Sequence, residues 1–230
     1  MMNRFFVPLV ALVAPFVLGS CNQLLDEQPD ERVTLDTPEK IRQVLVNAYP
    51  TASYAYACEM SSDNIDDYGK DNPNFSKFTY DLAYWIDGPE YNTSDGMRAL
   101  WRSHYLAIQH ANTALKAIEK LGGGSEMNPH KGEALVARAY AHFVLVNLFG
   151  KHYNTATSST DLGIPYQTAP EETLNPQYQR NTVAEVYASI DKDLTEGLPL
   201  ISDSYYTQKE RHFNKAAAEA FAARFYLFYE

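Results

Sequence analysis

Apolar residues recur every three or four positions in five segments of the chain, the spacing of a helix that buries one face. The predicted helices cover residues 38–49, 95–121 and 129–149, with a fourth that begins at 182 and a fifth that begins near 214. No stretch alternates apolar and polar residues with a period of two, so the pattern favours helix throughout.

Capping signals support these boundaries. Thr37 is a suitable N-cap, and Pro38 fits the first position of a helix. Thr182 and Glu185 have the spacing of a capping box, in which each side chain bonds the other residue's backbone N–H. Gly150 follows the third predicted helix as a C-cap.

Two long connections, residues 50–94 and 151–180, separate the predicted helices. Connections of this length inside a domain are usually functional or disordered. The first is rich in Tyr, Asp and Asn, which is not the composition of a flexible linker, so we expect it to be ordered.

A short repeat indicates how the helices pair. Residues 137–140 read Ala-Arg-Ala-Tyr, and residues 223–226 read Ala-Arg-Phe-Tyr in the same place on a later helix. Two successive helix pairs with matched apolar faces are typical of helical-repeat arrays. The predicted fold class is therefore all-α, with tetratricopeptide-like helical hairpins and long ordered loops.

Three residues in the predicted helices have apolar surroundings that need an explanation. Trp101 lies on the apolar face of its helix, so we predict that it belongs to the core. Arg138 and Arg224 occupy equivalent positions in the repeat. We expect each guanidinium to be satisfied by carbonyl groups or by a carboxylate such as that of Glu133.

The first residues have the pattern of an export signal. Arg4 precedes the apolar stretch 5–18, which is too short to be a permanent transmembrane helix. Leu18-Gly19-Ser20-Cys21 resembles the lipobox of bacterial lipoproteins, so residues 1–20 are predicted to be a signal peptide and Cys21 to carry lipid. The alternative is a plain secretory signal with an incidental cysteine.

Residues 21–36 form an acidic tether. It is either a solvated spacer or an address, since an acidic segment here resembles the surface-export signal of Bacteroidetes-type lipoproteins. Residues 37–230 are predicted to be one helical domain, which we expect to be truncated because its last helix finishes on uncapped aromatic residues. Cys58 is the only other cysteine, so no intramolecular disulfide is expected and Cys58 is predicted to be a small buried residue.

The net charge is −10, and it becomes −11 when Arg4 is removed with residues 1–20, leaving 18 Lys and Arg against 29 Asp and Glu. Nucleic acids and anionic lipid surfaces require clusters of Lys and Arg. The acidity therefore argues against nucleic acid as a partner.

Four stretches, in order, resemble the SusD/RagB family of nutrient-binding outer-membrane lipoproteins. The matching positions are Trp101, Tyr105, Ile108 and Asn112; Glu133, Arg138, Tyr140 and Phe143, followed by Gly163-Ile164-Pro165; Arg180, Thr182 and Tyr187; and Arg211 with Ala223-Arg224-Phe225-Tyr226. Each stretch alone is weak, but their order together with the lipobox is specific.

This resemblance implies an α-helical fold on tetratricopeptide-type repeats. It implies a lipid-anchored protein on the extracellular face of the cell outer membrane, where it is the lid of a SusC-like TonB-dependent transporter. The implied ligand is an oligosaccharide or a peptide, and the family has neither enzymatic activity nor a cofactor. The alternative is a tetratricopeptide-type scaffolding lipoprotein that faces the periplasm and binds protein partners.

The candidate ligand-binding residues lie in the first long connection. Sugar rings present apolar C–H faces that stack on aromatic side chains, while amides and carboxylates bond their hydroxyl groups. The candidates are Tyr80, Asp81, Tyr84, Trp85, Asp87, Tyr91 and Asn92. The alternative is that these aromatic residues pack against the helices and hold the connection together.

Neither a metal site nor a catalytic site is predicted. Asp63, Asp66, Asp67 and Asp71 are close together, but Ile65 occupies the position of a calcium ligand in an EF-hand, so a solvated acidic loop is the better interpretation. The six histidines form no metal-binding spacing, and the sequence contains no nucleophile or phosphate-binding motif.

Overall fold

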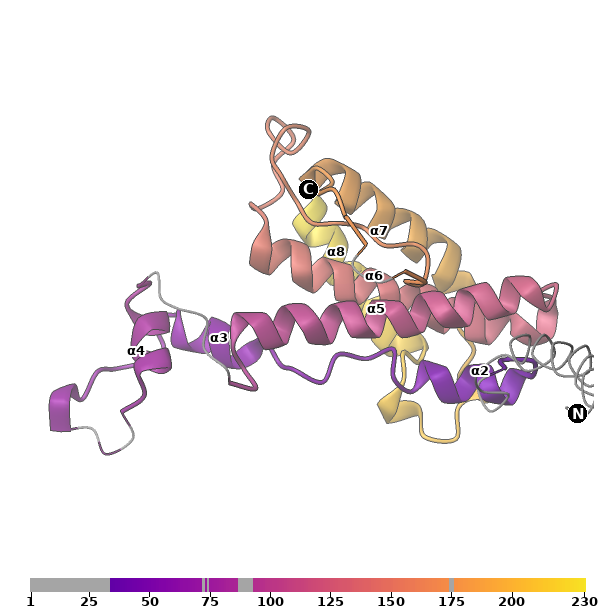
Figure 1. Ribbon diagram of the computed structural model, residues 1–230, viewed down its shortest axis with the longest axis horizontal. Coiled ribbons are helices and arrows are strands. Elements are labelled where there is room, and N and C mark those ends of the chain that lie inside the picture. Colours follow the sequence, from indigo (N-terminus) through magenta and orange to yellow (C-terminus); the bar gives the residue numbers. More distant parts are fainter. Residues whose placement is uncertain (1–33, 72, 74, 87–92, 174–175) are drawn as a thin grey trace, which may run out of the picture. The chain divides into compact units, whose positions relative to one another are not determined.

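The computed structural model describes residues 34–71, 73, 75–86, 93–173 and 176–230. In this part of the chain the regular elements are helices. An isolated antiparallel bridge pairs Leu162 with Thr182, both in the connection between two helices. The helices, shown in Figure 1, are α2 (Pro38–Leu45), α3 (Ala55–Met60), α4 (Lys77–Ala83), α5 (Met97–Lys120), α6 (Asn128–Phe149), α7 (Val183–Gly197) and α8 (Lys215–Tyr229). The predicted all-α fold class is confirmed.

The predicted caps explain where several helices begin. Thr37 Oγ1 accepts the backbone N–H of Lys40 at 3.3 Å. In α7, Thr182 Oγ1 accepts the N–H of Glu185 at 3.2 Å, and Glu185 Oε2 accepts the N–H of Thr182 at 2.8 Å. Asn214 caps α8. The capping box is thus confirmed. Helix α5 begins at Met97, two residues later than predicted, and α2 ends at Leu45, four residues before the predicted end at 49.

Helix α6 forms the centre of the core. It packs against α5, α7, α2 and α8, and residues 133–139 and 141–146 are buried. A helix that is apolar on all sides belongs in an interior. The approach of α6 to the end of α7 requires glycine, because a Cβ on Gly132 would lie 2.9 Å from the carbonyl oxygen of Gly197.

The buried arginine of α6 has a different partner from the one expected. Arg138 bonds both carboxylate oxygens of Asp193 on α7, at 2.6 and 2.7 Å, and bonds Asn112 on α5 at 2.8 Å. Glu133 instead accepts hydrogen bonds from Tyr49 and His212. The sequence could not predict the pairing of Arg138 with Asp193, because Asp193 lies on another helix.

Two expectations about burial were wrong, and Arg224 bonds a hydroxyl group where a carbonyl or carboxylate was expected. Trp101 is 36% exposed, because it lies at the edge of the α5–α6 contact. Its ring centroid is 5.0 Å from that of Phe149. Cys58 is exposed on α3, whose only buried residue is Ala57. Arg224 is exposed, and it donates a hydrogen bond to the Tyr54 hydroxyl at 2.7 Å.

No helix in the described part of the chain is both long and apolar enough to cross a bilayer. The predicted signal peptide, the lipidation site Cys21 and most of the tether lie outside the described residues.

Candidate functional site

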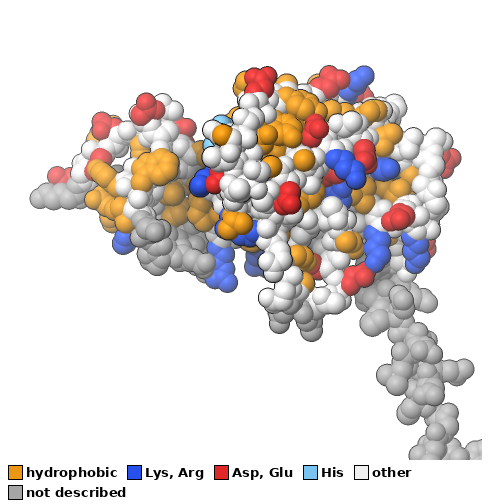
Figure 2. Space-filling model, turned by 90° about the horizontal axis from the view of Figure 1, so that it is seen from above, with side chains coloured by type: hydrophobic (Ala, Val, Ile, Leu, Met, Phe, Trp, Pro, Cys, Tyr) orange, Lys and Arg blue, Asp and Glu red, His pale blue; other side chains and the backbone are white. Residues whose placement is uncertain are grey.

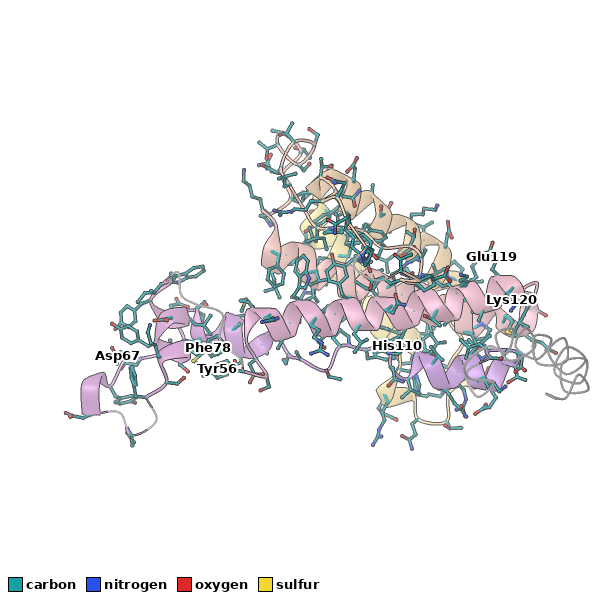
Figure 3. All side chains as sticks on the ribbon, in the orientation of Figure 1. Tyr56, Asp67, Phe78, His110, Glu119 and Lys120 are labelled. Carbon is teal, nitrogen blue, oxygen red and sulfur yellow. The ribbon has the colours of Figure 1, made fainter. Side chains whose placement is uncertain are left out.

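Two short helices, α3 and α4, organise the first long connection. The ring of Phe78 on α4 is buried and stacks on that of Tyr56 on α3, with centroids 6.2 Å apart (Figure 3). The Tyr56 hydroxyl and Thr79 Oγ1 are 2.6 Å apart, within hydrogen-bond distance. The prediction missed both helices because a segment rich in Tyr and Asp shows no apolar period. Ring packing, not a separate apolar core, holds them together.

Four exposed rings lie on α4 or next to its ends. Phe75, Tyr80, Tyr84 and Trp85 are 62%, 40%, 50% and 79% exposed, and we call these four residues the α4 aromatic face. Tyr80 and Tyr84 are one helical turn apart, and their centroids are separated by 4.6 Å. Figure 2 shows hydrophobic side chains gathered on this part of the molecule, at the left of the view. Exposed apolar patches are where proteins bind ligands or partners, so the α4 aromatic face is the candidate site.

Tyr84 is held in place by an acidic neighbour. Its hydroxyl donates to Asp67 Oδ2 at 2.6 Å, and Asp67 Oδ1 accepts the backbone N–H of Gly69 at 2.7 Å. The hydrogen bond from Tyr84 lowers the pKa of the Asp67 carboxyl and raises that of the Tyr84 phenol. Tyr84 therefore stays protonated, Asp67 stays charged, and the ring is oriented before any ligand arrives.

Trp85 has an unusual backbone. Helix α4 ends in a Schellman motif, in which the N–H of Trp85 bonds the carbonyl of Leu82 at 3.3 Å and the N–H of Ile86 bonds that of Asp81 at 2.8 Å. The residue at the left-handed position of this motif is normally glycine, but here it is Trp85, with φ +53°. A bulky residue at positive φ is disfavoured, and 79% of this side chain is exposed. Burial does not explain why a tryptophan occupies this position.

The structure separates the predicted site residues into three groups. Tyr80 and Tyr84 pack together on the α4 aromatic face, and Trp85 follows Tyr84 directly in the chain with its side chain exposed. Asp81 lies on the buried side of α4, where its carboxylate bonds Lys77 Nζ at 2.7 and 2.8 Å, so its place in the structure favours holding the helix over contacting a ligand.

The remaining predicted site residues, Asp87, Tyr91 and Asn92, lie outside the described residues. Sequence reasoning missed two contributors to the site. Phe75 extends the exposed rings, with its centroid 6.0 Å from that of Tyr80, and Asp67 orients Tyr84. Phe75 precedes α4, and no spacing in the sequence indicated that its ring would lie beside that of Tyr80.

The chemistry of this surface suits a neutral ligand with apolar faces and hydroxyl groups. The rings offer stacking planes, and Asp67 beside Tyr84 offers an acceptor for hydroxyl protons. In the part of the chain that the structure describes, no group of three or more His, Cys, Asp or Glu residues is arranged to hold a metal ion. Asp63, Asp66, Asp67 and Asp71 are all exposed, as a solvated acidic loop would be.

A family model named SusD-like, and described as starch-binding and associating with the outer membrane, matches residues 23–227. No curated protein matches the chain significantly.

Several solved structures share the fold. A SusD superfamily protein from Bacteroides thetaiotaomicron is 23% identical over 86% of this chain, with a TM-score of 0.65. One from Bacteroides fragilis is 21% identical over 84%, also with a TM-score of 0.65. A laminarin-binding SusD-like protein is 19% identical over 84%, with a TM-score of 0.61. The chain covers only 43%, 46% and 40% of these three structures, less than half of each.

Proposed function

The chain belongs to the SusD-like family, and on this basis we propose that it binds a glycan through the α4 aromatic face without cleaving it. The observation that carries the proposal is Trp85. A 79% exposed indole that occupies the glycine position of a Schellman motif destabilises its own turn. Backbone strain of this kind is concentrated at functional sites, where binding makes use of the strained residue.

An oligosaccharide fits this surface better than a peptide does. Sugar rings stack on aromatic planes, and stacking supplies much of the affinity because hydroxyl groups gain little when they exchange water for protein. Figures 2 and 3 show the exposed apolar side chains and Asp67 on the same part of the molecule. One structural neighbour is described as laminarin-binding, so a β-glucan belongs in the first panel of ligands.

Calorimetry with a panel of oligosaccharides that includes laminarin fragments tests the proposal. We expect an affinity in the micromolar range, about −8 kcal/mol, and no cleaved product after long incubation. Trp85→Ala should weaken binding, whereas Tyr178→Ala, which removes an exposed ring outside α3 and α4, should not. Binding of a peptide in place of every sugar, or release of cleaved product, would refute the proposal.

We also propose that the protein is anchored by lipid at Cys21 to the cell outer membrane, on its extracellular face, and is the lid of a SusC-like TonB-dependent transporter. The lipobox pattern at residues 18–21 and the description of the family model support this placement. Cys21→Ala should abolish labelling with palmitate. Protease added to intact cells should cleave the protein, whereas a periplasm-facing scaffolding lipoprotein would be protected.

A further inference from the structure

The first long connection carries more than half of the net negative charge of the chain. Residues 50–94 contain eight Asp and Glu against two Lys and no Arg, so they contribute −6 to the net charge of −10. Charge gathered on one part of a surface changes the local concentration of charged ligands. Stacking of a ligand on the α4 aromatic face makes no use of this charge.

Two hydrogen bonds keep the Asp67 carboxylate charged beside the exposed rings. Oδ2 accepts from the Tyr84 hydroxyl at 2.6 Å, and Oδ1 accepts the N–H of Gly69 at 2.7 Å. The bond from Tyr84, followed by that from Gly69, lowers the pKa of the Asp67 carboxyl, and no cationic side chain that the structure describes contributes to this. The negative charge of Asp67 therefore faces the ligand without a described Lys or Arg to offset it.

The Tyr84 hydroxyl has already used its proton. Because this O–H donates to Asp67, the phenol oxygen can only accept a hydrogen bond from a ligand. The bond to Asp67 is the main cause that raises the pKa of the Tyr84 phenol, and the charge of Asp66 contributes to the same shift. A ligand beside Tyr84 thus meets acceptors and two negative charges.

The one lysine of α4 is matched by a carboxylate of its own helix. Lys77 Nζ bonds both oxygens of the buried Asp81 carboxylate, at 2.8 and 2.7 Å. Its positive charge therefore neutralises Asp81, and it does not offset the charge of Asp67.

We propose that Asp67 and Tyr84 make the α4 aromatic face select neutral glycans and reject acidic ones, whose sugars carry carboxylate or sulfate groups. A sugar hydroxyl can donate to either oxygen, whereas a carboxylate or sulfate has only acceptors and would lie beside a like charge. Salt screens exposed charges over ~8 Å at physiological ionic strength, so this selection acts at close range and weakens as salt is added. The inference rests on the proposed function, because it names the class of glycan for the same site.

NMR of the full chain without any glycan tests the charge itself. Two nitroxides, one with an ammonium group and one with a carboxylate, each speed the relaxation of nearby amide protons. At the Tyr84 amide the ammonium nitroxide should act about twice as strongly as the carboxylate nitroxide. Asp67→Asn, which keeps an oxygen to accept from Tyr84, should lower this ratio. Glu219→Gln, which removes an exposed charge on α8, should leave it unchanged.

Calorimetry tests the selection with a matched pair of ligands. A laminarin fragment is compared with the same fragment oxidised to a carboxylate at C6, and each neutral oligosaccharide that binds is treated in the same way. We expect the neutral ligand to bind about tenfold more tightly at low salt. This ratio should fall about threefold in Asp67→Asn and in ~0.5 M NaCl. If Asp67 only oriented Tyr84, the substitution would weaken both ligands equally and leave the ratio unchanged.

The outcomes separate this inference from the proposed function. Equal or tighter binding of the carboxylated ligand, or a nitroxide ratio of one or less at Tyr84, would refute the inference and leave the proposed function standing. If neither ligand of any pair binds while the nitroxide ratio is high, the proposed function is wrong, and the repulsion of anions by the α4 aromatic face is still supported.

Discussion

Arg138 and Asp193 form a two-pronged ion pair between α6 and α7, with Nε to Oδ2 at 2.7 Å and Nη2 to Oδ1 at 2.6 Å. Their side chains are only 9% and 4% exposed. Tyr166 also donates its hydroxyl to Asp193 Oδ2, at 2.6 Å. Because this pair is buried and links α6 to α7, it fixes how these two helices pack against each other.

Removing one partner should leave the other charge buried and alone. We expect Asp193→Ala to lower the free energy of unfolding by about 3–5 kcal/mol, measured by urea denaturation. Asp36→Ala, which removes an exposed partner of Lys40, should leave the midpoint unchanged. Equal midpoints for the two variants would show that water solvates Arg138.

His142 should make the protein sensitive to acid. Its Nδ1 donates to the Arg138 carbonyl at 2.9 Å, its Nε2 accepts from the Gln167 N–H at 3.1 Å, and burial lowers its pKa from 6.5 to about 3. Between these values the unfolded state binds the proton and the folded state does not. Stability is therefore full above pH 6.5 and falls as the pH drops, by up to ~1.4 kcal/mol per pH unit.

The variant His142→Gln isolates this effect. It should be less stable than the wild type at pH 7, yet it should lose less stability between pH 6 and pH 4. Urea denaturation at several pH values gives both slopes. Parallel slopes for the two proteins would mean that other groups cause the acid sensitivity.

Trp101 should contribute less to stability than a core residue on the same helix. Because 36% of it is exposed, we expect Trp101→Ala to cost about 1–2 kcal/mol. Ile108→Ala, at a position with 0% exposure, should cost ~2–5 kcal/mol. Thermal unfolding compares the stability of the two variants. A larger loss of stability in Trp101→Ala than in Ile108→Ala would show that Trp101 acts as a core residue.

The side chain of Trp85 should destabilise the turn that ends α4. Trp85→Gly removes the side chain that disfavours φ +53°, so the α4 turn should be about 1 kcal/mol more stable than in Trp85→Ala. Hydrogen exchange of the Ile86 amide, which bonds Asp81, reports the opening of this turn. Faster exchange in Trp85→Gly than in Trp85→Ala would show that the turn is not strained.

The sequence predicts the helices whose ends carry local signals. Thr37 with Pro38, the capping box at Thr182 and the N-cap Asn214 each bond within a few residues, so their effect can be read along the chain. Arg138 with Asp193 could not be predicted in this way. That pair depends on how α6 packs against α7, and many carboxylates were available.

The candidate site was predicted in part for similar reasons. Exposed aromatic residues in a polar connection pointed to Tyr80, Tyr84 and Trp85. The short helix α4, which puts Asp81 inside, is held by ring packing on Tyr56 and has no apolar period to reveal it. The exposure of Trp101 was missed because a helical wheel shows which face is apolar but does not show where its neighbours stop.

The chain contains two tryptophans, which allows the central claim to be measured directly. Trp101→Phe leaves Trp85 as the only indole, and Trp85→Phe leaves only Trp101. If a glycan stacks on the α4 aromatic face, an oligosaccharide that binds in calorimetry should quench or blue-shift the fluorescence of the Trp101→Phe protein, with a matching midpoint, and leave the Trp85→Phe protein unchanged. A response only in the protein that retains Trp101 would contradict the account.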